Sequence, residues 1–232
     1  MNPDLGEMAT YSAVLMGDIV GSEHVASTAE LHARFNEVVN HHNKVNAAML
    51  ASPLTITLGD EFQGLVTSLV SAAHLAREIR HDLMAHSIDC RFAIGAVHLE
   101  TPVNTEKAWN MMGPGFASTR AKLNDKRASN RYRFDVIGHP LLEIMLEASG
   151  ATLTVIEQSW TDTQRSDIRA LLDGSTPREI ARLRNVSVHN IYKVRTSGNF
   201  ALYMTQWNAI NEALSTLDEL FTTERTEECS MV

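Results

Sequence analysis

The sequence predicts an α+β protein in two parts: a ferredoxin-like, or palm, βαββαβ domain followed by an all-α domain that contains a helix-turn-helix. Three observations lead to this prediction. Strand and helix patterns alternate up to about residue 140, two Gly-Asp turns each follow an apolar strand, and only helical patterns are convincing afterwards. We therefore expect a palm domain over residues 9–140 and a helical domain over residues 141–232.

The elements of the first part follow from two periodicities. Residues 11–16 are a compact apolar run that ends at Gly17-Asp18, which is the pattern of a buried strand. Alternation on both sides of Gly59-Asp60 predicts a hairpin over residues 54–66. The same reasoning predicts helices over residues 28–50, 68–85 and about 115–126, and strands over 88–99 and 131–137. The pattern over residues 151–156 is ambiguous between strand and helix.

Composition limits the class of protein. The chain has 232 residues, is 44% hydrophobic and carries a formal net charge of −8, which is typical of an ordinary globular protein and argues against a coat of nucleic acid. Its two cysteines are too few for a disulfide framework or a zinc site. Because we find neither a signal-peptide pattern nor a membrane-spanning apolar stretch, we expect a cytoplasmic protein that contacts no membrane.

Two acidic turns are the first candidate site. Asp18 follows the first strand, and Asp60 lies at the tip of the hairpin. In a βαββ unit the first strand lies beside the hairpin, so the two carboxylates are expected to face each other. Such a pair suits Mg²⁺, or Mn²⁺, which takes oxygen ligands and shares its remaining positions with substrate phosphates.

The surroundings of these turns suit a phosphate. Gly17 and Gly21 allow the backbone to approach a ligand closely, and a helix that begins near Ser27-Thr28 would present its N-terminus to the same spot. The alternative is structural: Gly-Asp is an ordinary hairpin turn, and Asp18 could cap a helix. The presence of both turns on the expected elements favours a metal or nucleotide site.

The segment MGDIVGS resembles the first metal motif of class III nucleotide cyclases, and LGDEFQGL resembles their second and the GGDEF motif of diguanylate cyclases. The resemblance implies Asp18 and Asp60 as metal ligands, together with the Ile19 carbonyl and Glu61, and Arg120 as a catalytic arginine. Leu58 replaces the first glycine of GGDEF, which argues against diguanylate synthesis. The residues expected to contact the nucleotide are Gly17, Ile19, Gly21, Ser22 and Gly59.

A helix-turn-helix is predicted over residues 161–197. Thr176, Pro177 and Glu179 form a capping-box pattern, Asn185 supplies the turn, and Ser187 caps the next helix. The residues expected to pack inward are Ile168, Leu171, Leu172, Ile180, Ala181, Leu183, Val186, Val188, Ile191 and Val194. This run resembles the helix-turn-helix of LuxR-type regulators and of sigma-factor region four.

Polar side chains on this unit are candidates for DNA contact. A recognition helix presents such residues to base edges and phosphates. We expect DNA contacts from Arg178, Arg182, Arg184, Ser187, His189, Asn190, Tyr192, Lys193 and Arg195. Residues 161–205 carry seven basic and four acidic side chains, a net charge of +3, so the acidity of the chain belongs to the rest. The alternative is a helical hairpin that only packs or contacts protein.

The last helix, predicted over residues 199–222, has apolar residues at alternating spacings of four and three. This seam consists of Tyr203, Trp207, Ile210, Leu214, Leu217 and Phe221. It could pair two chains into a homodimer, as DNA-binding modules often require, or it could pack on its own domain.

Taken over its whole length, the chain resembles the SatD family, in which a cyclase-like half precedes a helix-turn-helix. The main hypothesis is a DNA-binding transcriptional regulator whose palm domain binds a nucleotide and Mg²⁺. The alternative is a cyclase that converts a nucleoside triphosphate to a cyclic nucleotide and pyrophosphate. A third interpretation is a scaffold whose two modules bind only protein.

Overall fold

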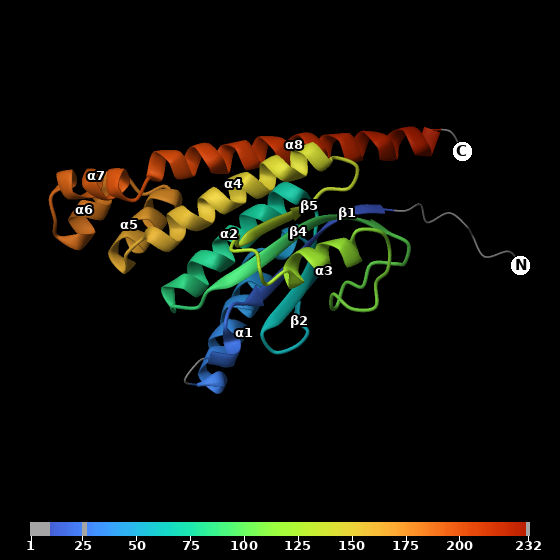
Figure 1. Cartoon of the computed structure of the whole chain (residues 1–232), viewed down its shortest axis with the longest axis horizontal. Helices are drawn as coiled ribbons and strands as arrows, with labels where there is room; N and C mark the ends of the chain where they lie inside the picture. Colours follow the sequence, from blue (N-terminus) through green and yellow to red (C-terminus); the bar gives the residue numbers. More distant parts are fainter. Residues whose placement is uncertain (1–9, 25–26, 231–232) are drawn as a thin grey trace, which may run out of the picture.

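A five-stranded sheet lies at the centre of the protein, for which the computed structural model describes residues 10–24 and 27–230 (Figure 1). The strand order is β2-β3-β1-β4-β5. β1 lies between β3 and β4 and is antiparallel to both, whereas β5 is parallel to β4. The strands are β1 (Thr10–Ile19), β2 (Leu50–Ile56), β3 (Glu61–Val66), β4 (Cys90–Leu99) and β5 (Tyr132–Asp135). The predicted palm arrangement is therefore confirmed, with one added edge strand.

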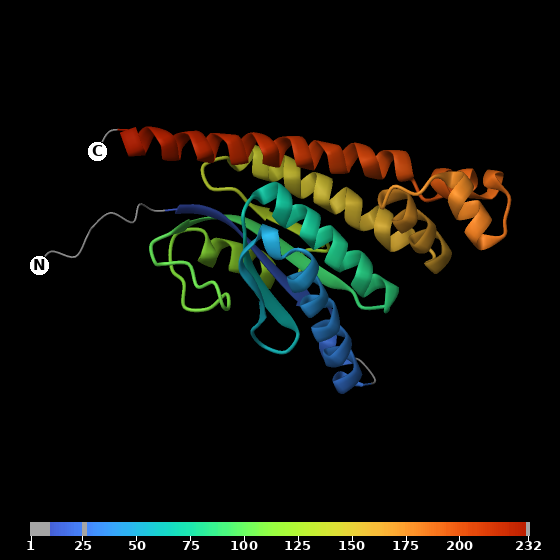
Figure 2. The same cartoon turned by 180° about the vertical axis from the view of Figure 1, so that it is seen from behind.

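Helices cover both faces of this sheet. The larger hydrophobic core joins one face to α1 (Thr28–Val45), α2 (Leu69–Ala85), α4 (Pro140–Ser159) and α8 (Phe200–Ser230) (Figure 2). A smaller core joins the other face to α3 (Phe116–Asn124). The side chains of each strand alternate between the two cores, so neighbouring residues serve different faces.

The two predicted domains share one core. Leu146 and Leu153 of α4 and Trp207 of α8 belong to the same buried cluster as the strands and α2. Asp218 of α8 also accepts hydrogen bonds from the backbone N–H groups of Leu69 and Val70 at the start of α2. The boundary at residue 140 stays a prediction, and the packing of α4 and α8 runs across it.

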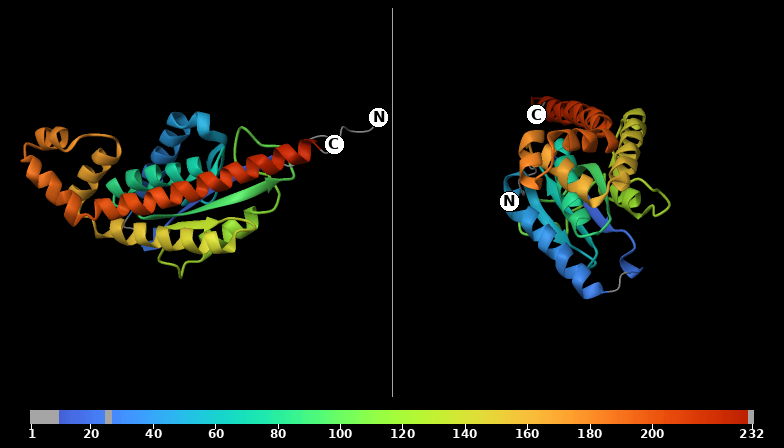
Figure 3. Two further views of the ribbon diagram at one scale, coloured as in Figure 1. Left: turned by 90° about the horizontal axis from the view of Figure 1, so that it is seen from above. Right: turned by 90° about the vertical axis from the view of Figure 1, so that its left-hand side faces the viewer.

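The apolar seam of α8 packs against its own chain. Tyr203, Trp207, Ile210, Leu214 and Leu217 are all at most 2% exposed. The intramolecular alternative is therefore the correct one for these positions, and they leave no apolar seam for a second chain. We call the sheet together with α1, α2 and α3 the sheet module. Figure 3 shows α8 lying along this module for most of its length.

Three shorter helices form a compact unit at one end of the molecule (Figure 3). They are α5 (Asp162–Leu172), α6 (Pro177–Arg184) and α7 (Val188–Ser197). α5 packs against α2, and α7 packs against α8. The helices and the turn lie where the sequence predicts them, and Trp160, at the junction of α4 and α5, is buried.

The structure corrects several predicted details. β1 extends to Ile19, so Asp18 lies inside the strand rather than after it. Residues 151–156 belong to α4, because their apolar side chains continue its buried face. α1 ends at Val45, and α8 continues to Ser230 rather than ending near residue 222. Among the helices of the described residues, none is long and apolar enough to cross a membrane.

Candidate functional site

The end of β1 brings together the first acidic segment and the hairpin. Asp18 lies opposite Glu61 of β3 and Arg91 of β4, and all three side chains belong to the sheet face that α3 covers. The neighbouring Gly17 serves the other face, where a side chain would collide with the Phe62 ring. Alternation along the strand therefore places the acidic side chain on the α3 face.

The hairpin holds Asp60 against the same end of β1. The Ile19 N–H donates to the Asp60 carbonyl at 3.0 Å, and the Ser22 hydroxyl donates to the Asp60 carboxylate at 2.6 Å. Gly59 has a φ of 87°, a left-handed conformation that glycine adopts without strain. The structure thus brings five predicted positions to one corner of the sheet, which we call the acidic corner: Asp18, Ile19, Ser22, Gly59 and Asp60.

Arg91 is a member of this corner that the sequence prediction missed. Its Nε lies 3.4 Å from an Asp18 carboxylate oxygen, and its side chain is 8% exposed. Within the described residues, its Nε and Nη1 have no hydrogen-bond acceptor. An arginine in the apolar run of residues 88–99 was the available signal, because a buried guanidinium needs acceptors.

Asp18 is in an environment that opposes its charge. Burial raises the pKa of Asp18, Arg91 counteracts part of this rise, and Asp60 adds to it by repulsion. A carboxylate whose pKa is raised by burial and by a second carboxylate favours a bound proton or a bound cation. The atoms of Asp18 and Asp60 that could bind a metal are carboxylate oxygens, which are ligands suited to Mg²⁺ or Mn²⁺.

The fit to a metal rests on these two carboxylates. Across the described residues, no group of three His, Cys, Asp or Glu side chains is arranged to hold a metal. Glu61 accepts a hydrogen bond from the Thr57 hydroxyl and forms an ion pair with Arg120. Two protein carboxylates are sufficient for Mg²⁺ where substrate phosphates complete the shell.

Arg120 reaches the same face from α3. It forms the ion pair with Glu61 and donates to the Gln63 side-chain oxygen at 2.6 Å. Burial lowers the pKa of Arg120, and Asp18 counteracts that effect. The predicted catalytic arginine is therefore near the corner, held by two neighbours on β3.

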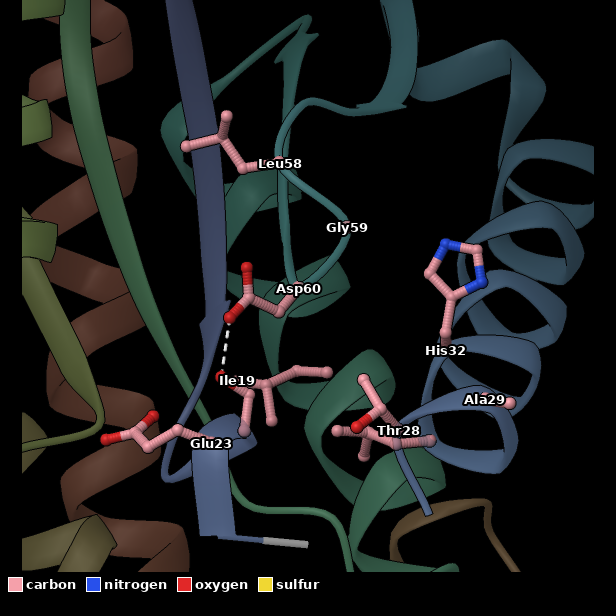
Figure 4. Close-up of a pocket in the computed structure, with 10 residues that line it drawn as sticks. Ile19, Glu23, Thr28, Ala29, His32, Leu58, Gly59 and Asp60 are labelled. Carbon is pink, nitrogen blue, oxygen red and sulfur yellow. Dashed lines mark hydrogen bonds between the residues drawn. The ribbon is translucent and has the colours of Figure 1, made fainter.

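A cavity of about 500 Å³ opens beside Asp60 (Figure 4). The hairpin lines one side, and Thr28, Ala29 and His32 of α1 line the other. Ser27 caps α1, and its hydroxyl accepts the Glu30 N–H. The N-terminus of α1 therefore lies across this cavity from Asp60, whereas Asp18 is not among the residues that line it.

The unit formed by α5, α6 and α7 has the caps that the sequence predicts. Thr176 and Glu179 form the capping box of α6, Asn185 is left-handed at φ 53°, and Ser187 caps α7. Ile180, Ala181 and Ile191 form its small core. Leu183 is 77% exposed, so its predicted inward packing is wrong: α6 is short, and the core uses the face of Ile180 instead.

Most of the predicted DNA-contact residues are on the surface. The exposed ones are Arg178, Arg182, Arg184, Ser187, His189, Asn190, Tyr192 and Lys193. Arg184 forms an ion pair with the buried Asp167, and Arg195 is half-buried and lies over the Tyr192 and Phe200 rings. Ser187 uses its hydroxyl as a cap. These three side chains have structural partners in the protein.

Comparison with known proteins gives one family and a group of structures. The model of the SatD family matches residues 11–213. No curated protein matches. One similar structure is the catalytic core of a rhodopsin-guanylyl cyclase with converted specificity in complex with ATPαS, at 15% identity, TM-score 0.41, 55% of this chain and 78% of that chain.

Two further structures illustrate the range of the similarity. The non-canonical dimeric guanylyl cyclase domain of the RhoGC fusion protein from the aquatic fungus Blastocladiella emersonii is 16% identical, with a TM-score of 0.40, over 55% of this chain and 80% of that chain. A bacterial light-regulated adenylyl cyclase is 13% identical, with a TM-score of 0.42, over 58% of this chain and 45% of that chain.

Proposed function

The chain belongs to the SatD family, and from that premise we propose that its sheet domain binds a nucleoside triphosphate with Mg²⁺ at the corner formed by β1 and the β2–β3 hairpin. One observation carries the proposal. Arg91 is buried beside Asp18 with two nitrogens that have no acceptor among the described residues, at the place where Asp60 also lies. The Arg91 nitrogens favour an anionic ligand, and the two carboxylates favour a cation bound to that ligand.

Each side chain of the corner then has a task. Asp18 and Asp60 would hold the ion, which supplies positive charge next to the phosphates. Arg91 would donate its two unused N–H groups to phosphate oxygens. Ser22 and the Ile19 N–H hold Asp60 in position by the hydrogen bonds already described.

The reaction that this arrangement fits is cyclisation of the triphosphate. The ribose 3′ oxygen would form a bond to the α-phosphorus, its proton would leave to solvent or a carboxylate, and the bond to the pyrophosphate oxygen would break. Arg120, which forms an ion pair with Glu61 opposite Asp18, would neutralise the charge that develops on the phosphate once it exchanges this contact. Binding is the step that this proposal shares with a sensor that does not turn over.

Incubation with labelled ATP or GTP and Mg²⁺ or Mn²⁺ tests both steps. We expect saturable binding and a cyclic product from the native protein, and neither from Asp60→Ala. Asp173→Ala, which removes an exposed carboxylate on the helix-turn-helix side, should behave as the native protein does. Binding without a product would support a nucleotide sensor and contradict the cyclase. Unchanged binding by Asp60→Ala would contradict both functions.

DNA binding by α6 and α7 is a second candidate function. The observation that favours it is a surface of exposed basic and polar side chains on two helices whose caps and core fit a helix-turn-helix. The chain would then be a regulator in which the nucleotide alters the placement of this unit. Because phosphate contacts dominate affinity for DNA, salt should weaken binding strongly.

A gel shift with fragments of the promoter region of its own gene tests this function. Replacing Lys193 and Arg195 by Ala should weaken binding by about tenfold or more and lower its salt dependence. The matched control replaces Arg34 and Lys44 of α1 by Ala, since these lie on the sheet module. Equal binding by both double variants would show that α7 is not the recognition helix.

A further inference from the structure

Two adjoining cavities lie between the end of α2 and the start of α5, away from the acidic corner. Their volumes are about 430 and 310 Å³. Met84, Ser87 and Arg165 line both, so the two cavities meet at these side chains. We call the combined space the α2–α5 pocket.

Two arginines of the α2–α5 pocket have donors without acceptors. Arg80 is 1% exposed; it donates to Glu157, Asp89 and the Cys90 carbonyl, but its Nη2 is buried with no acceptor among the described residues. The buried Nε of Arg165 has none there either, although its Nη1 donates to Asp162. Buried N–H groups of charged side chains are rarely left without acceptors.

The carboxylates of the pocket are already neutralised. Asp82 forms an ion pair with Arg169 and a hydrogen bond with the ring of His42. Asp89 forms ion pairs with Arg80 and Arg131. Asp162 pairs with Arg165, and its side chain is 96% exposed. The unused capacity in the pocket is therefore for an acceptor, and a ligand of negative charge would supply it.

We propose that the α2–α5 pocket binds a small organic anion, whose carboxylate or phosphate group accepts hydrogen bonds from Arg80 and Arg165. Met84, Ala85 and Trp160 line the larger cavity and supply an apolar wall for the rest of the ligand. A charged group held by convergent donors beside an apolar wall is the usual arrangement of a small-molecule site.

The position of the pocket gives this ligand a regulatory role. Arg165 lies on α5, the first helix of the helix-turn-helix, whereas Arg80 lies on α2 of the sheet module. Arg80 also holds Asp89, whose backbone carbonyl accepts the Val20 N–H at 2.8 Å next to the acidic corner. A ligand bound by both arginines would fix the helix-turn-helix relative to the sheet module.

Titration with inorganic phosphate and, separately, with benzoate tests the proposal and distinguishes the two kinds of anion. Calorimetry gives the affinity, and ¹H–¹⁵N spectra of the arginine Nε–H groups give the location. We expect saturable binding of at least one probe, with shifts at Arg80 and Arg165, and about a tenfold loss of affinity in Arg165→Gln. The matched control is Arg34→Gln on α1, which should bind as the native protein does.

The outcomes that overturn the proposal are specific. It fails if neither probe binds saturably, or if Arg165→Gln keeps the affinity of Arg34→Gln. It also fails if Arg91→Gln abolishes phosphate binding while Arg165→Gln does not, because the anion then occupies the acidic corner. Since the pocket shares no residue with that corner, each proposal can fail without the other.

Discussion

Two carboxylates that face buried arginines, Glu157 and Asp18, differ in how completely they are satisfied. Arg80 of α2 lies 2.5 Å from Glu157, which also accepts hydrogen bonds from the hydroxyls of Tyr132 and Tyr203. Arg91 of β4 lies 3.4 Å from Asp18, and two of its nitrogens have no acceptor in the described part of the chain. The first pair is held by a network across α2, α4, β5 and α8, whereas the second lies at the end of a sheet.

The pKa values of the two carboxylates reflect the same difference. Burial opposes the charge of both. At Glu157, Arg80 and His81 outweigh burial and lower the pKa to about 2. At Asp18, Arg91 does not outweigh burial and the repulsion by Asp60, so the pKa is raised. A buried carboxylate whose charge is satisfied by its own chain stabilises the fold, whereas one whose charge is not satisfied leaves part of that work to a ligand.

The same substitution at each arginine tests this contrast most strongly. Arg80→Met leaves Glu157, which is fully buried, without its cation, and we expect a loss of about 3–5 kcal/mol of stability. Arg91→Met removes a guanidinium with poor hydrogen bonding, so its expected cost is about 1 kcal/mol or less. Urea unfolding of both variants measures the difference. Equal losses would contradict the distinction between the two pairs.

Acid unfolding should reveal the Glu157 pair next. Because the pKa of Glu157 in the folded state lies below its ordinary value of 4.5, its stabilisation is complete above that pH and is lost as the pH falls towards about 2. The total is about 3 kcal/mol by linkage. Urea unfolding at pH 2–7 measures it. A double variant, Arg80→Met with Glu157→Leu, should lack this part of the pH dependence; an identical profile would assign the acid sensitivity to other groups.

The order of strands and helices was predictable because strand and helix periods are local properties of the sequence. The capping box of α6, the N-cap of α7 and the two Gly-Asp turns are local too, and the caps of both helices appear in the structure as predicted. Asp18 and Asp60 could be assigned to one corner because the βαββ order fixes which strand lies beside the hairpin.

Long-range pairing was the part that the sequence did not reveal. Arg91 reaches Asp18 only through the register of β1 with β4, which depends on strands more than 70 residues apart in the chain. The seam of α8 is equally apolar whether it packs on α2 or on a second chain, so periodicity could not choose its partner. Leu183 was assigned to the core from spacing alone, although a helix of 8 residues buries only a narrow face.

Replacing Asp18 should stabilise the protein slightly, whereas replacing Arg80 destabilises it strongly. Because its pKa is raised in the folded state, its charge destabilises the fold above that raised pKa, and the penalty disappears as the pH falls below its ordinary value of 3.8. Asp18→Asn should therefore gain up to about 1 kcal/mol near pH 7 and nothing at pH 3, while losing nucleotide binding. Urea unfolding at both pH values, with a nucleotide-binding assay, checks this; a loss of stability would make Asp18 structural.

The smallest effect is expected at Asp89, which connects the two regions. Its carboxylate contacts both Arg80 and Arg131 at 2.8 Å, but its side chain is 35% exposed, so water can replace much of what it provides. Asp89→Asn should cost less than about 1 kcal/mol in urea unfolding. The backbone carbonyl that accepts the Val20 N–H is retained, so nucleotide affinity should not change. A variant of normal stability that bound nucleotide weakly would show that the Arg80 network reaches into the acidic corner through this carboxylate, and the two pairs would then have to be treated as one site.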